Sequence, residues 1–540
     1  MSTVADLIVQ RLRDAGVNVI FGVPGGGSNL DLLDAATRAG VSFVLTSTET
    51  GAVIAAMAHA EITGAPGVCL TTLGPGAASA VNGVACAFLD RAPVLVFTDS
   101  HPAAARECTH QRIDHQRLFA PITKQSVSLT AGNADDAVRE ALTCAMTPPF
   151  GPVHLDCPGD VLSSSATARD EHSVARQRSA DALSRSAKTF ALEPPSDPFA
   201  LAARARRPLL LVGLGARQQA DAEAIRALSE RRGVPAMVTY KAKGVVPDDH
   251  PWFAGVLTNA AIERPLLDEA DLLIGLGLDP VELIPRPWTV AAPIVSGGPF
   301  PVETGHVPFK AQLVADIPAV VRAIDRALAP SGWNRDAIRA TMDGQRSAIA
   351  DAGGAFTAQR VIEIAARRLA STACVTVDAG AHMFPATTLW PVCEPNGMLI
   401  SNGLSTMGFA LPAAVGAALT DRARRVVALT GDGGLLMCVG ELATAARERL
   451  DLIIIVFADE SLSLIEIKQA QRRLAPRGVG LGRVEWTKIA EGFGVAAFAA
   501  ADEAALDAAL EQASARGGPS LIEARIDASN YGRTLRAVRG

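Results

Sequence analysis

Aromatic residues are scarce in this sequence. Phenylalanine, tryptophan and tyrosine together make up 4% of its 540 residues, whereas hydrophobic residues as a whole make up 49%. Alanine, valine and leucine supply much of that hydrophobicity, glycine is abundant besides, and this composition suits buried parallel strands and closely packed helices. Since a domain takes roughly 150 residues, the composition favours an α/β protein of several domains.

A strong net charge is missing as well. The formal net charge of −6 at pH 7 argues against a nucleic-acid-binding protein. No uncharged apolar run is long enough to cross a membrane, and the N-terminal "MSTVADLIVQRLRDAG" is typical of an amphipathic helix rather than a signal peptide. We therefore expect a soluble protein of the cytoplasm.

Paired cysteines are also absent. The eight cysteines form no CxxC motif and show no metal-ligand spacing, which indicates reduced core thiols rather than disulfides or a zinc site. They are Cys69, Cys86, Cys108, Cys144, Cys157, Cys374, Cys393 and Cys438.

What the sequence does contain is a repeated alternation of short apolar strands with helical segments. The alternation occurs in three series, each typical of a parallel sheet. The predicted domains are residues 1–165, 198–328 and 356–540, and the predicted linkers are residues 166–197 and 329–355. The first linker is rich in serine, alanine, arginine and proline and lacks apolar periodicity.

The predicted strands are apolar runs that end in glycine or in a polar residue. In the first series they lie in "VNVIFGVPGG", "SFVLTS", "GVCLTTLGPG", "APVLVFTDS" and "GPVHLDCPGD". In the second they lie in "PLLLVGLGAR", "PAMVTYKAKG", "ADLLIGLGLD", "APIVSGG" and "AQLVAD". In the third they lie in "CVTVDAGAH", "GMLISNGLSTMGFALPAAVGAA", "RVVALTGDGG", "LIIIVFADES" and "PSLIEARID".

The stretch "ALTGDGGLL" has the features of a metal and phosphate site. Asp432 stands between an apolar strand and a helix, and a carboxylate there suits Mg²⁺, which prefers oxygen ligands. The flanking glycines let backbone N–H groups approach a diphosphate. Asp459 ends the next predicted strand, and a right-handed crossover could bring both acids to one ion. A simple helix cap formed by Asp432 is the alternative.

This arrangement resembles the diphosphate-binding motif of the thiamine-diphosphate-dependent enzymes. The blocks "FGVPGGGSNLDLLDA", "TSTETGAVIAAMAHAEITGAPGVCLTTLGPGAASAVNGVACAFLDRAPVLVFT", "PITK", "SNGLSTMGFALPAAVGAAL" and "GELATAARERLDLIIIVF" are similar to the acetolactate-synthase-like branch of that family. The resemblance implies a fold of three doubly wound parallel-sheet domains. The first would bind the pyrimidine, the second would be the middle domain, and the third would bind the diphosphate. It also implies thiamine diphosphate and Mg²⁺ as cofactors.

The resemblance assigns roles to single residues. Glu49 would hydrogen-bond the aminopyrimidine ring, although a glutamate after a strand is also a common helix cap. Met407 would hold the cofactor in its bent form, an orientation effect, although a lone methionine is usually core filler. Ser405 would offer its backbone carbonyl to the amino group.

Further cofactor and metal contacts are implied in the same way. The implied metal ligands are Asp432, Asp459 and Ser461. The other implied cofactor contacts are Pro24, Gly25, Gly74, Gly76, Asn82, Gly380, Ala381, His382, Gly431, Gly433, Gly434 and Leu462. The sequence departs from the family at Ala381, where glutamine is common, and at Ala458-Asp459, where two asparagines are usual. Aspartate can still bind a metal.

The substrate side is less defined. Gln111 matches a family glutamine near the donor site, and Glu466 falls close to a decarboxylase glutamate that could move a proton. Lys468 occupies the position of a tryptophan that selects the acceptor in biosynthetic acetolactate synthases. Glu466 and Lys468 could equally face solvent. His110 and His115 are possible acid–base groups, but we favour reading them as surface histidines on a loop.

These features predict an enzyme that cleaves a 2-oxo acid and adds the acyl group to a carbonyl acceptor, as acetolactate synthases do. A non-ligating decarboxylase is the alternative, followed by a flavin-dependent oxidase of the pyruvate-oxidase type. "FAGVLTNAAIERPLL" argues against FAD, and the weak "VGLGAR" and "IGLGLDP" turns are poor support for an NAD enzyme. The resemblance implies a homodimer or homotetramer with its active site at the subunit interface.

Overall fold

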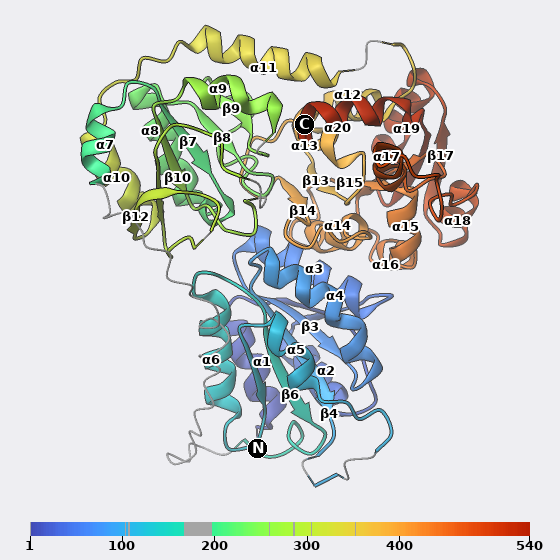
Figure 1. The fold of residues 1–540 in the computed structure, drawn as a ribbon. Coiled ribbons are helices and arrows are strands. Elements are labelled where there is room, and N and C mark those ends of the chain that lie inside the picture. The colour runs from blue at the N-terminus through green and yellow to red at the C-terminus, as the bar shows by residue number, and fades with distance from the viewer. Residues whose placement is uncertain are drawn as a thin grey trace. The chain divides into compact units, whose positions relative to one another are not determined.

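The computed structural model describes residues 2–102, 104–105, 109–166, 197–258, 260–283, 287–303, 305–350 and 353–539. These residues form three six-stranded parallel sheets with helices between the strands (Figure 1). This confirms the predicted α/β fold of three parallel-sheet domains. The first predicted linker, residues 166–197, lies almost wholly outside the described residues.

The first and third sheets share one strand order, and the second differs. The first sheet runs β2-β1-β3-β4-β6-β5 and the third runs β14-β13-β15-β16-β18-β17, so the nth strands of both occupy equivalent places. The second sheet runs β12-β11-β10-β7-β8-β9. The strands of the first sheet are β1 (Val19–Val23), β2 (Ser42–Leu45), β3 (Gly67–Thr71), β4 (Val94–Ser100), β5 (Gln125–Ser128) and β6 (Val153–Pro158). Those of the second are β7 (Pro208–Val212), β8 (Ala236–Val238), β9 (Phe253–Val256), β10 (Leu272–Leu276), β11 (Ile294–Gly298) and β12 (Phe309–Val314). Those of the third are β13 (Cys374–Val377), β14 (Met398–Ile400), β15 (Val426–Gly431), β16 (Leu452–Ala458), β17 (Ala496–Ala500) and β18 (Ser520–Arg525).

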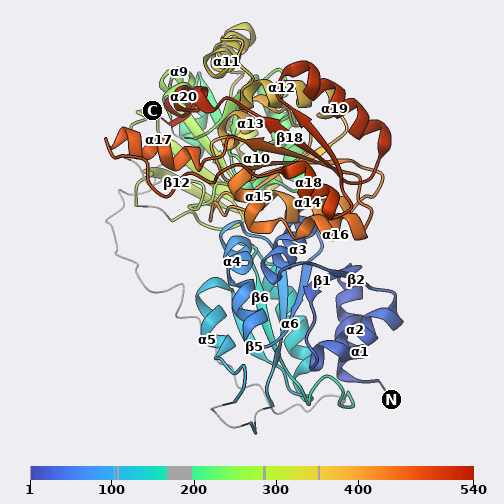
Figure 2. The same cartoon turned by 90° about the vertical axis from the view of Figure 1, so that its right-hand side faces the viewer.

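Helices cover both faces of the sheets. Figure 2 shows α1 and α2 on one side of the first sheet and α4 and α5 on the other. The helices around this sheet are α1 (Val4–Asp14), α2 (Ser28–Ala39), α3 (Glu49–Thr63), α4 (Pro75–Leu89), α5 (His115–Phe119), η1 (Ala120–Ile122) and α6 (Ala134–Met146). Those that follow are α7 (Pro198–Arg204), η2 (Leu214–Ala216), α8 (Gln219–Arg232), η3 (Ala261–Glu263), α9 (Arg264–Glu269), α10 (Ile317–Ala327) and α11 (Arg335–Ile349). The last series is α12 (Ala358–Leu369), α13 (Met383–Leu389), α14 (Ala410–Ala418), α15 (Asp432–Cys438), α16 (Glu441–Arg447), α17 (Ser463–Gln471), α18 (Trp486–Gly492), α19 (Glu503–Arg516), η4 (Ala528–Asn530) and α20 (Tyr531–Arg539).

The strands form where the sequence has continuous apolar runs. Every residue of β7, with the sequence PLLLV, is buried, as are nearly all residues of β16, LIIIVFA. Parallel strands covered by helices on both faces need this continuous hydrophobicity. All the predicted strands are present, but β5, β9 and β17 were not predicted.

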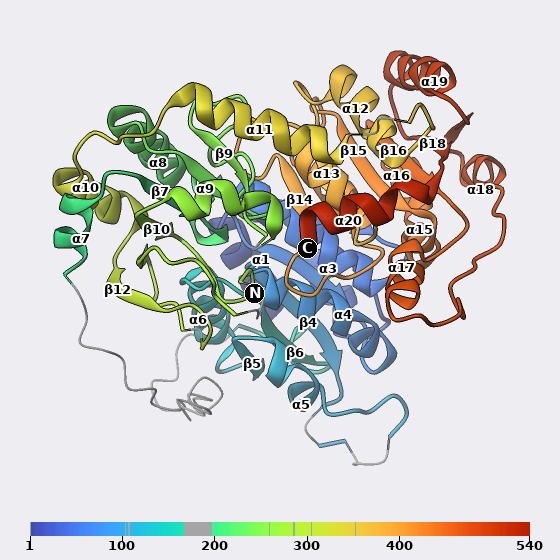
Figure 3. The same cartoon turned by 45° about the horizontal axis from the view of Figure 1, so that its top comes forward.

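The chain divides into two compact units. The first unit contains the first sheet together with Leu411–Arg422 and Cys438–Leu450, and the second contains the second and third sheets. Within the second unit, α11 contacts β9 and α9 of the middle domain and α13 and α20 of the third (Figure 3). The segment predicted as the second linker therefore holds a helix of 15 residues.

Two further predictions from the sequence concern membrane-spanning helices and the cysteines. Among the described residues, no helix has both the length and the apolar character needed to cross a bilayer. None of the described cysteines forms a disulfide, and Cys69, Cys86, Cys157, Cys374 and Cys438 are buried as expected. Cys393 is exposed, which corrects the interpretation of all cysteines as core thiols. Cys108 lies outside the described residues.

Candidate functional site

Two acidic strand ends of the third sheet lie beside each other. β15 and β16 pair in parallel with Gly431 opposite Phe457, so the residues that follow each strand meet at one sheet edge. Asp432 Oδ2 accepts the backbone N–H of Asp459 at 3.2 Å and that of Glu460 at 2.7 Å. Glu460 has a φ of +59°, and this left-handed turn directs both N–H groups to one carboxylate oxygen.

Burial shifts the pKa values of both carboxylates, and the charge of Asp459 adds to the shift at Asp432. Burial and the nearby charge of Asp459 raise the pKa of Asp432 to about 6, and burial raises the pKa of Asp459. Asp459 is fixed by the Ser461 N–H at 3.2 Å and by the Ser463 hydroxyl at 2.6 Å. Within the described part of the chain, no group of three or more His, Cys, Asp and Glu side chains is arranged for a metal. A cation here would need further oxygens from backbone, water or ligand.

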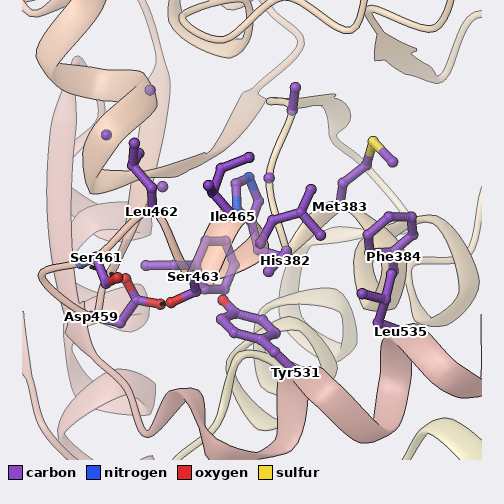
Figure 4. A pocket seen from close by; sticks show the side chains of 18 of the residues that line it. His382, Met383, Phe384, Asp459, Ser461, Leu462, Ser463, Ile465, Tyr531 and Leu535 are labelled. Carbon is purple, nitrogen blue, oxygen red and sulfur yellow. Dashed lines mark hydrogen bonds between the residues drawn. The ribbon is translucent and has the colours of Figure 1, made fainter. Parts of the chain in front are cut away.

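The predicted residues of the third domain line one cavity of about 600 Å³. Figure 4 shows Asp459, Ser461 and Ser463 at one end of it and Met383, Phe384 and Leu535 at the other. The predicted residues that line the cavity are Gly380, Ala381, His382, Ser405, Met407, Gly431, Asp432, Gly433, Gly434, Asp459, Ser461 and Leu462.

His382 presents an unsatisfied polar atom in this cavity. Its ring is stacked on Phe457 with 5.0 Å between centroids, and burial lowers its pKa to about 4, so the imidazole is neutral. Among the described residues its Nε2 has no hydrogen-bond partner. Because a buried polar atom without a partner is costly, a ligand that pairs with Nε2 fits the site.

Asp378 organises the loops around the cavity, and the sequence analysis missed it. It is fully buried at the end of β13, where its Oδ2 accepts from Gly408 N at 3.1 Å and from the Thr430 hydroxyl at 3.0 Å. Burial raises its pKa to about 6. A Cβ on Gly434 would collide with its carboxylate, so glycine is required there. The position of Asp378 directly after an apolar strand, as for Asp432, was the available signal.

Helix α17 carries Glu466 and Lys468, for which the sequence allowed either a role in the site or a position facing solvent. Lys468 lines the cavity together with Leu464, Ile465 and Gln471. Glu466 does not line it, and its Oε2 accepts from the Ser461 hydroxyl at 2.7 Å. Both side chains are exposed to solvent, and of the two only Lys468 also lines the cavity. Tyr531, Leu535 and Arg536 of α20 also line the cavity and carried no recognisable motif.

In the first unit, Glu49 is the first residue of α3 and is half-buried. The helix cap is Thr48, whose hydroxyl accepts from Gly51 N at 2.9 Å, so capping does not explain Glu49. Glu441 of α16 accepts the N–H groups of Ser47 at 3.1 Å and Thr48 at 3.2 Å and so fixes the start of this helix. A Cβ on Gly76 would lie 3.1 Å from Oε1 of Glu49, which places these two predicted residues together.

The other predicted contacts of this unit are spread over two loops and a helix. Pro24 and Gly25 follow β1, and Gly25 N donates to Asn29 Oδ1 at 2.8 Å. Gly25 lies so close to Thr72 that a Cβ would clash with it. Asn82 is exposed on α4.

The two histidines differ. His110 is exposed as expected, but His115 is buried, so the surface interpretation is wrong for His115. His115 Nδ1 lies 2.9 Å from Asp156 Oδ1, and its Nε2 lies 3.1 Å from Gly74 N. His115 and Gln111 line a cavity of about 540 Å³. Gln111 has a φ of +61°, and its backbone packs directly against Gly74.

The GxG turns of the middle domain pack on each other. Gly215 N donates to Gly277 O at 2.9 Å, and a Cβ on Gly277 would lie 2.6 Å from Ala216 N. Beside them, Glu282 Oε2 accepts from Leu214 N at 2.8 Å, and burial raises the pKa of Glu282 to about 8. Close backbone packing thus accounts for these glycines.

Three family models match the chain in the order of its sheets. Residues 2–118 match the thiamine pyrophosphate enzyme N-terminal TPP binding domain, and residues 199–324 match the central domain of these enzymes. Residues 378–524 match the C-terminal TPP binding domain.

Several curated relatives match almost the whole chain. The acetolactate synthase isozyme 1 large subunit of Escherichia coli (strain K12) is 31% identical, over 97% of this chain and 94% of its own length. The acetolactate synthase of Bacillus subtilis (strain 168) is 27% identical, over 97% and 93%. A probable 2-ketoarginine decarboxylase of Pseudomonas aeruginosa is 29% identical, over 97% and 94%.

Proposed function

Since the chain belongs to the thiamine-diphosphate-dependent enzymes, in their acetolactate-synthase-like branch, we propose that it is a Mg²⁺-dependent carboligase of 2-oxo acids. The reaction releases the carboxylate of the donor as CO₂ and joins the remaining acyl group to an aldehyde or ketone. When bound, thiamine diphosphate supplies the electron sink for this cleavage. The observation that carries the proposal is the cavity at the paired strand ends of Asp432 and Asp459.

We assign Mg²⁺ and the diphosphate to this end of the cavity. Two neighbouring carboxylates, of which Asp432 has a pKa raised to about 6, gain from a divalent cation that offsets their repulsion. The backbone of Ser461 is the third proposed ligand position. The unpaired Nε2 of His382 can pair with a polar group of the bound ligand, and Gly380, Gly431, Gly433 and Gly434 leave room for a diphosphate.

Glu49 is the proposed partner of the aminopyrimidine ring, and its half-buried place beside Gly76 supports this role. Met407 and Ser405, which line the cavity, would orient the cofactor from the other side. Pro24, Gly25, Gly74, Gly76 and Asn82 remain proposed contacts of the first domain. Following the resemblance, we propose a homodimer or homotetramer in which Glu49 of one subunit and Asp432 of another serve one cofactor.

Simple decarboxylation is the second candidate. Lys468 lines the cavity and stands where biosynthetic acetolactate synthases have the tryptophan that selects the acceptor, which favours decarboxylation without ligation. The similarity to a probable decarboxylase also favours it. Glu466 is a weaker proton donor than first expected, because it does not line the cavity and is bound to Ser461. No feature of the described residues adds support for FAD.

The proposal is tested by incubating the protein with thiamine diphosphate, Mg²⁺ and pyruvate, with and without benzaldehyde. Products are separated by mass and chirality. Acetolactate or an aromatic hydroxyketone is the expected result, and Glu49→Gln should abolish it. Acetaldehyde and CO₂ alone would support the decarboxylase instead. A protein that binds the cofactor but converts no 2-oxo acid would contradict both functions.

A further inference from the structure

The cavity of the third domain has two chemically different ends. At one end lie the carboxylates of Asp432 and Asp459. At the other end, Met383, Phe384 and Leu535 form an apolar wall, and His382 and Ile465 lie between (Figure 4). The acidic end suits the metal and the diphosphate of the proposed function. The apolar end remains for the substrate.

Helix α17 runs from the acidic end of the cavity to the positively charged side chain of Lys468. It begins at Ser463, whose hydroxyl is bound to Asp459 at 2.6 Å. Lys468 lies five residues later and lines the same cavity. At about 1.5 Å per residue, this is roughly 7.5 Å further along the helix axis. Lys468 is also one turn beyond Ile465, on the same helix face.

Helix α20, on another wall of the cavity, likewise begins near the acidic end and carries a cationic side chain five residues later. It begins at Tyr531, where burial, together with the nearby carboxylates of Asp459 and Asp432, raises the pKa of the phenol. Arg536 lies five residues later, next to Leu535, and lines the cavity. Both helices therefore carry a cationic side chain away from the acidic end.

These two cations lack a counter-ion. Among the residues that the structure describes, neither Lys468 nor Arg536 forms an ion pair. The acidic side chain nearest along α17, Glu466, is bound to Ser461 and does not line the cavity. The substrate end thus combines an apolar wall with two cations that form no ion pair with any acidic side chain the structure describes.

We propose that this end binds a second carboxylate of the donor, so that the preferred 2-oxo acid is a dicarboxylate with a short methylene stem. The inference rests on the proposed function and names its substrate class. Lys468 and Arg536 would form charge-assisted hydrogen bonds with the distal carboxylate, while Met383, Phe384 and Leu535 contact the stem. A donor of the same shape without the distal charge leaves both cations unpaired and is selected against.

The test compares 2-oxoglutarate with 5-methyl-2-oxohexanoate, an isostere that lacks the distal charge, in CO₂ release by the holoenzyme. We expect kcat/KM for 2-oxoglutarate to be higher by about a hundredfold, since each of the two charge-assisted contacts corresponds to about tenfold. Raising the ionic strength should lower kcat/KM for 2-oxoglutarate only.

Variants then localise the effect. Lys468→Met and Arg536→Met keep the apolar stems and remove the charges. Each should lower kcat/KM for 2-oxoglutarate about tenfold and leave the isostere unchanged. The matched controls are Arg533→Met on the same helix α20 and Lys488→Met on α18, because both residues are exposed and do not line the cavity.

Three results would overturn the inference. Equal use of both donors by the wild type would do so while leaving the proposed function intact. Weaker binding of thiamine diphosphate by Lys468→Met or Arg536→Met, measured by fluorescence titration, would assign the cations to the diphosphate. If neither donor nor pyruvate is converted, the proposed function fails, and the inference fails with it.

Discussion

Gly74 donates its backbone N–H to Nε2 of His115 over 3.1 Å. An N–H can only donate, so Nε2 accepts, and the neutral imidazole carries its proton on Nδ1. That nitrogen lies 2.9 Å from Oδ1 of Asp156, which also accepts from the Thr98 hydroxyl at 2.9 Å. The glycine turn that would face the cofactor is thereby held by a buried histidine in one fixed tautomer.

His115→Leu should lower turnover about tenfold, because an unpaired buried N–H costs roughly 1–3 kcal/mol and the turn at Gly74 loses its support. His115→Gln can accept from Gly74 and donate to Asp156, so it should retain most of the turnover. The measurement is kcat and KM of both variants, with His110→Leu as the exposed control. Full turnover of His115→Leu would show that the turn needs no such support.

Mixing two inactive variants tests the proposed shared site. Glu49→Gln and Asp432→Asn homodimers should each be inactive. If Glu49 and Asp432 of different subunits serve one cofactor, random re-association of the two variants restores about a quarter of the wild-type activity, since half of the dimers are mixed and each regains one of two sites. Activity is measured before and after re-association. No recovery after confirmed subunit exchange would place both residues of a site in one chain.

Asp459→Asn should stabilise the protein in the absence of metal. It removes the charge that, after burial, raises the pKa of Asp432 to about 6, and an amide can still bond to Ser461 and Ser463. We expect a gain of about 1 kcal/mol in the free energy of unfolding at pH 7, since one pKa unit corresponds to about 1.4 kcal/mol. Thermal unfolding with and without Mg²⁺ and cofactor provides the measurement. Asp459→Ala, by contrast, should weaken Mg²⁺-dependent cofactor binding.

The pH dependence of stability should reveal Glu282. Burial raises its pKa from 4.5 to about 8, so the folded protein favours the protonated carboxyl. The protonated carboxyl of Glu282 makes its full contribution to the free energy of unfolding below pH 4.5. That contribution is lost as the pH rises towards 8. Glu282→Gln should therefore be more stable than the wild type at pH 8.5 by roughly 2 kcal/mol and similar to it near pH 4.5. An equal difference at both pH values would mean that Glu282 does not titrate in this range.

The central strands were predictable from sequence, and three edge strands were not. β5, β9 and β17 each lie at one edge of their sheet. An edge strand pairs on one side only and needs less hydrophobicity than a central strand. β5 has the sequence QSVS and is half-buried throughout, and β9 is short and contains Gly255 with a φ of +94°. β17 has the apolar sequence AAFAA, but four of its five residues are alanine, which is depleted in strands.

The candidate site was predictable where a motif marks a strand end, as at Asp432. It was less so where tertiary packing decides the environment of a side chain. His115 lies in a polar stretch, and only its contact with Asp156, from a strand 41 residues away, explains its burial. On α17, Glu466 and Lys468 are two positions apart, and of the two the helix rotation places only Lys468 in the lining of the cavity. The residues of α20 line the cavity because of tertiary contacts, which no local sequence pattern predicts.

The strand order shared by the first and third sheets also bears on the ancestry of the chain. Two sheets wound in the same sequence of steps are what a tandem duplication of one gene segment would leave. The middle sheet follows a different path, as expected for a segment inserted between the copies. The two sheets of common strand order then carry different residues at their proposed cofactor contacts, Glu49 on one and Asp432 on the other.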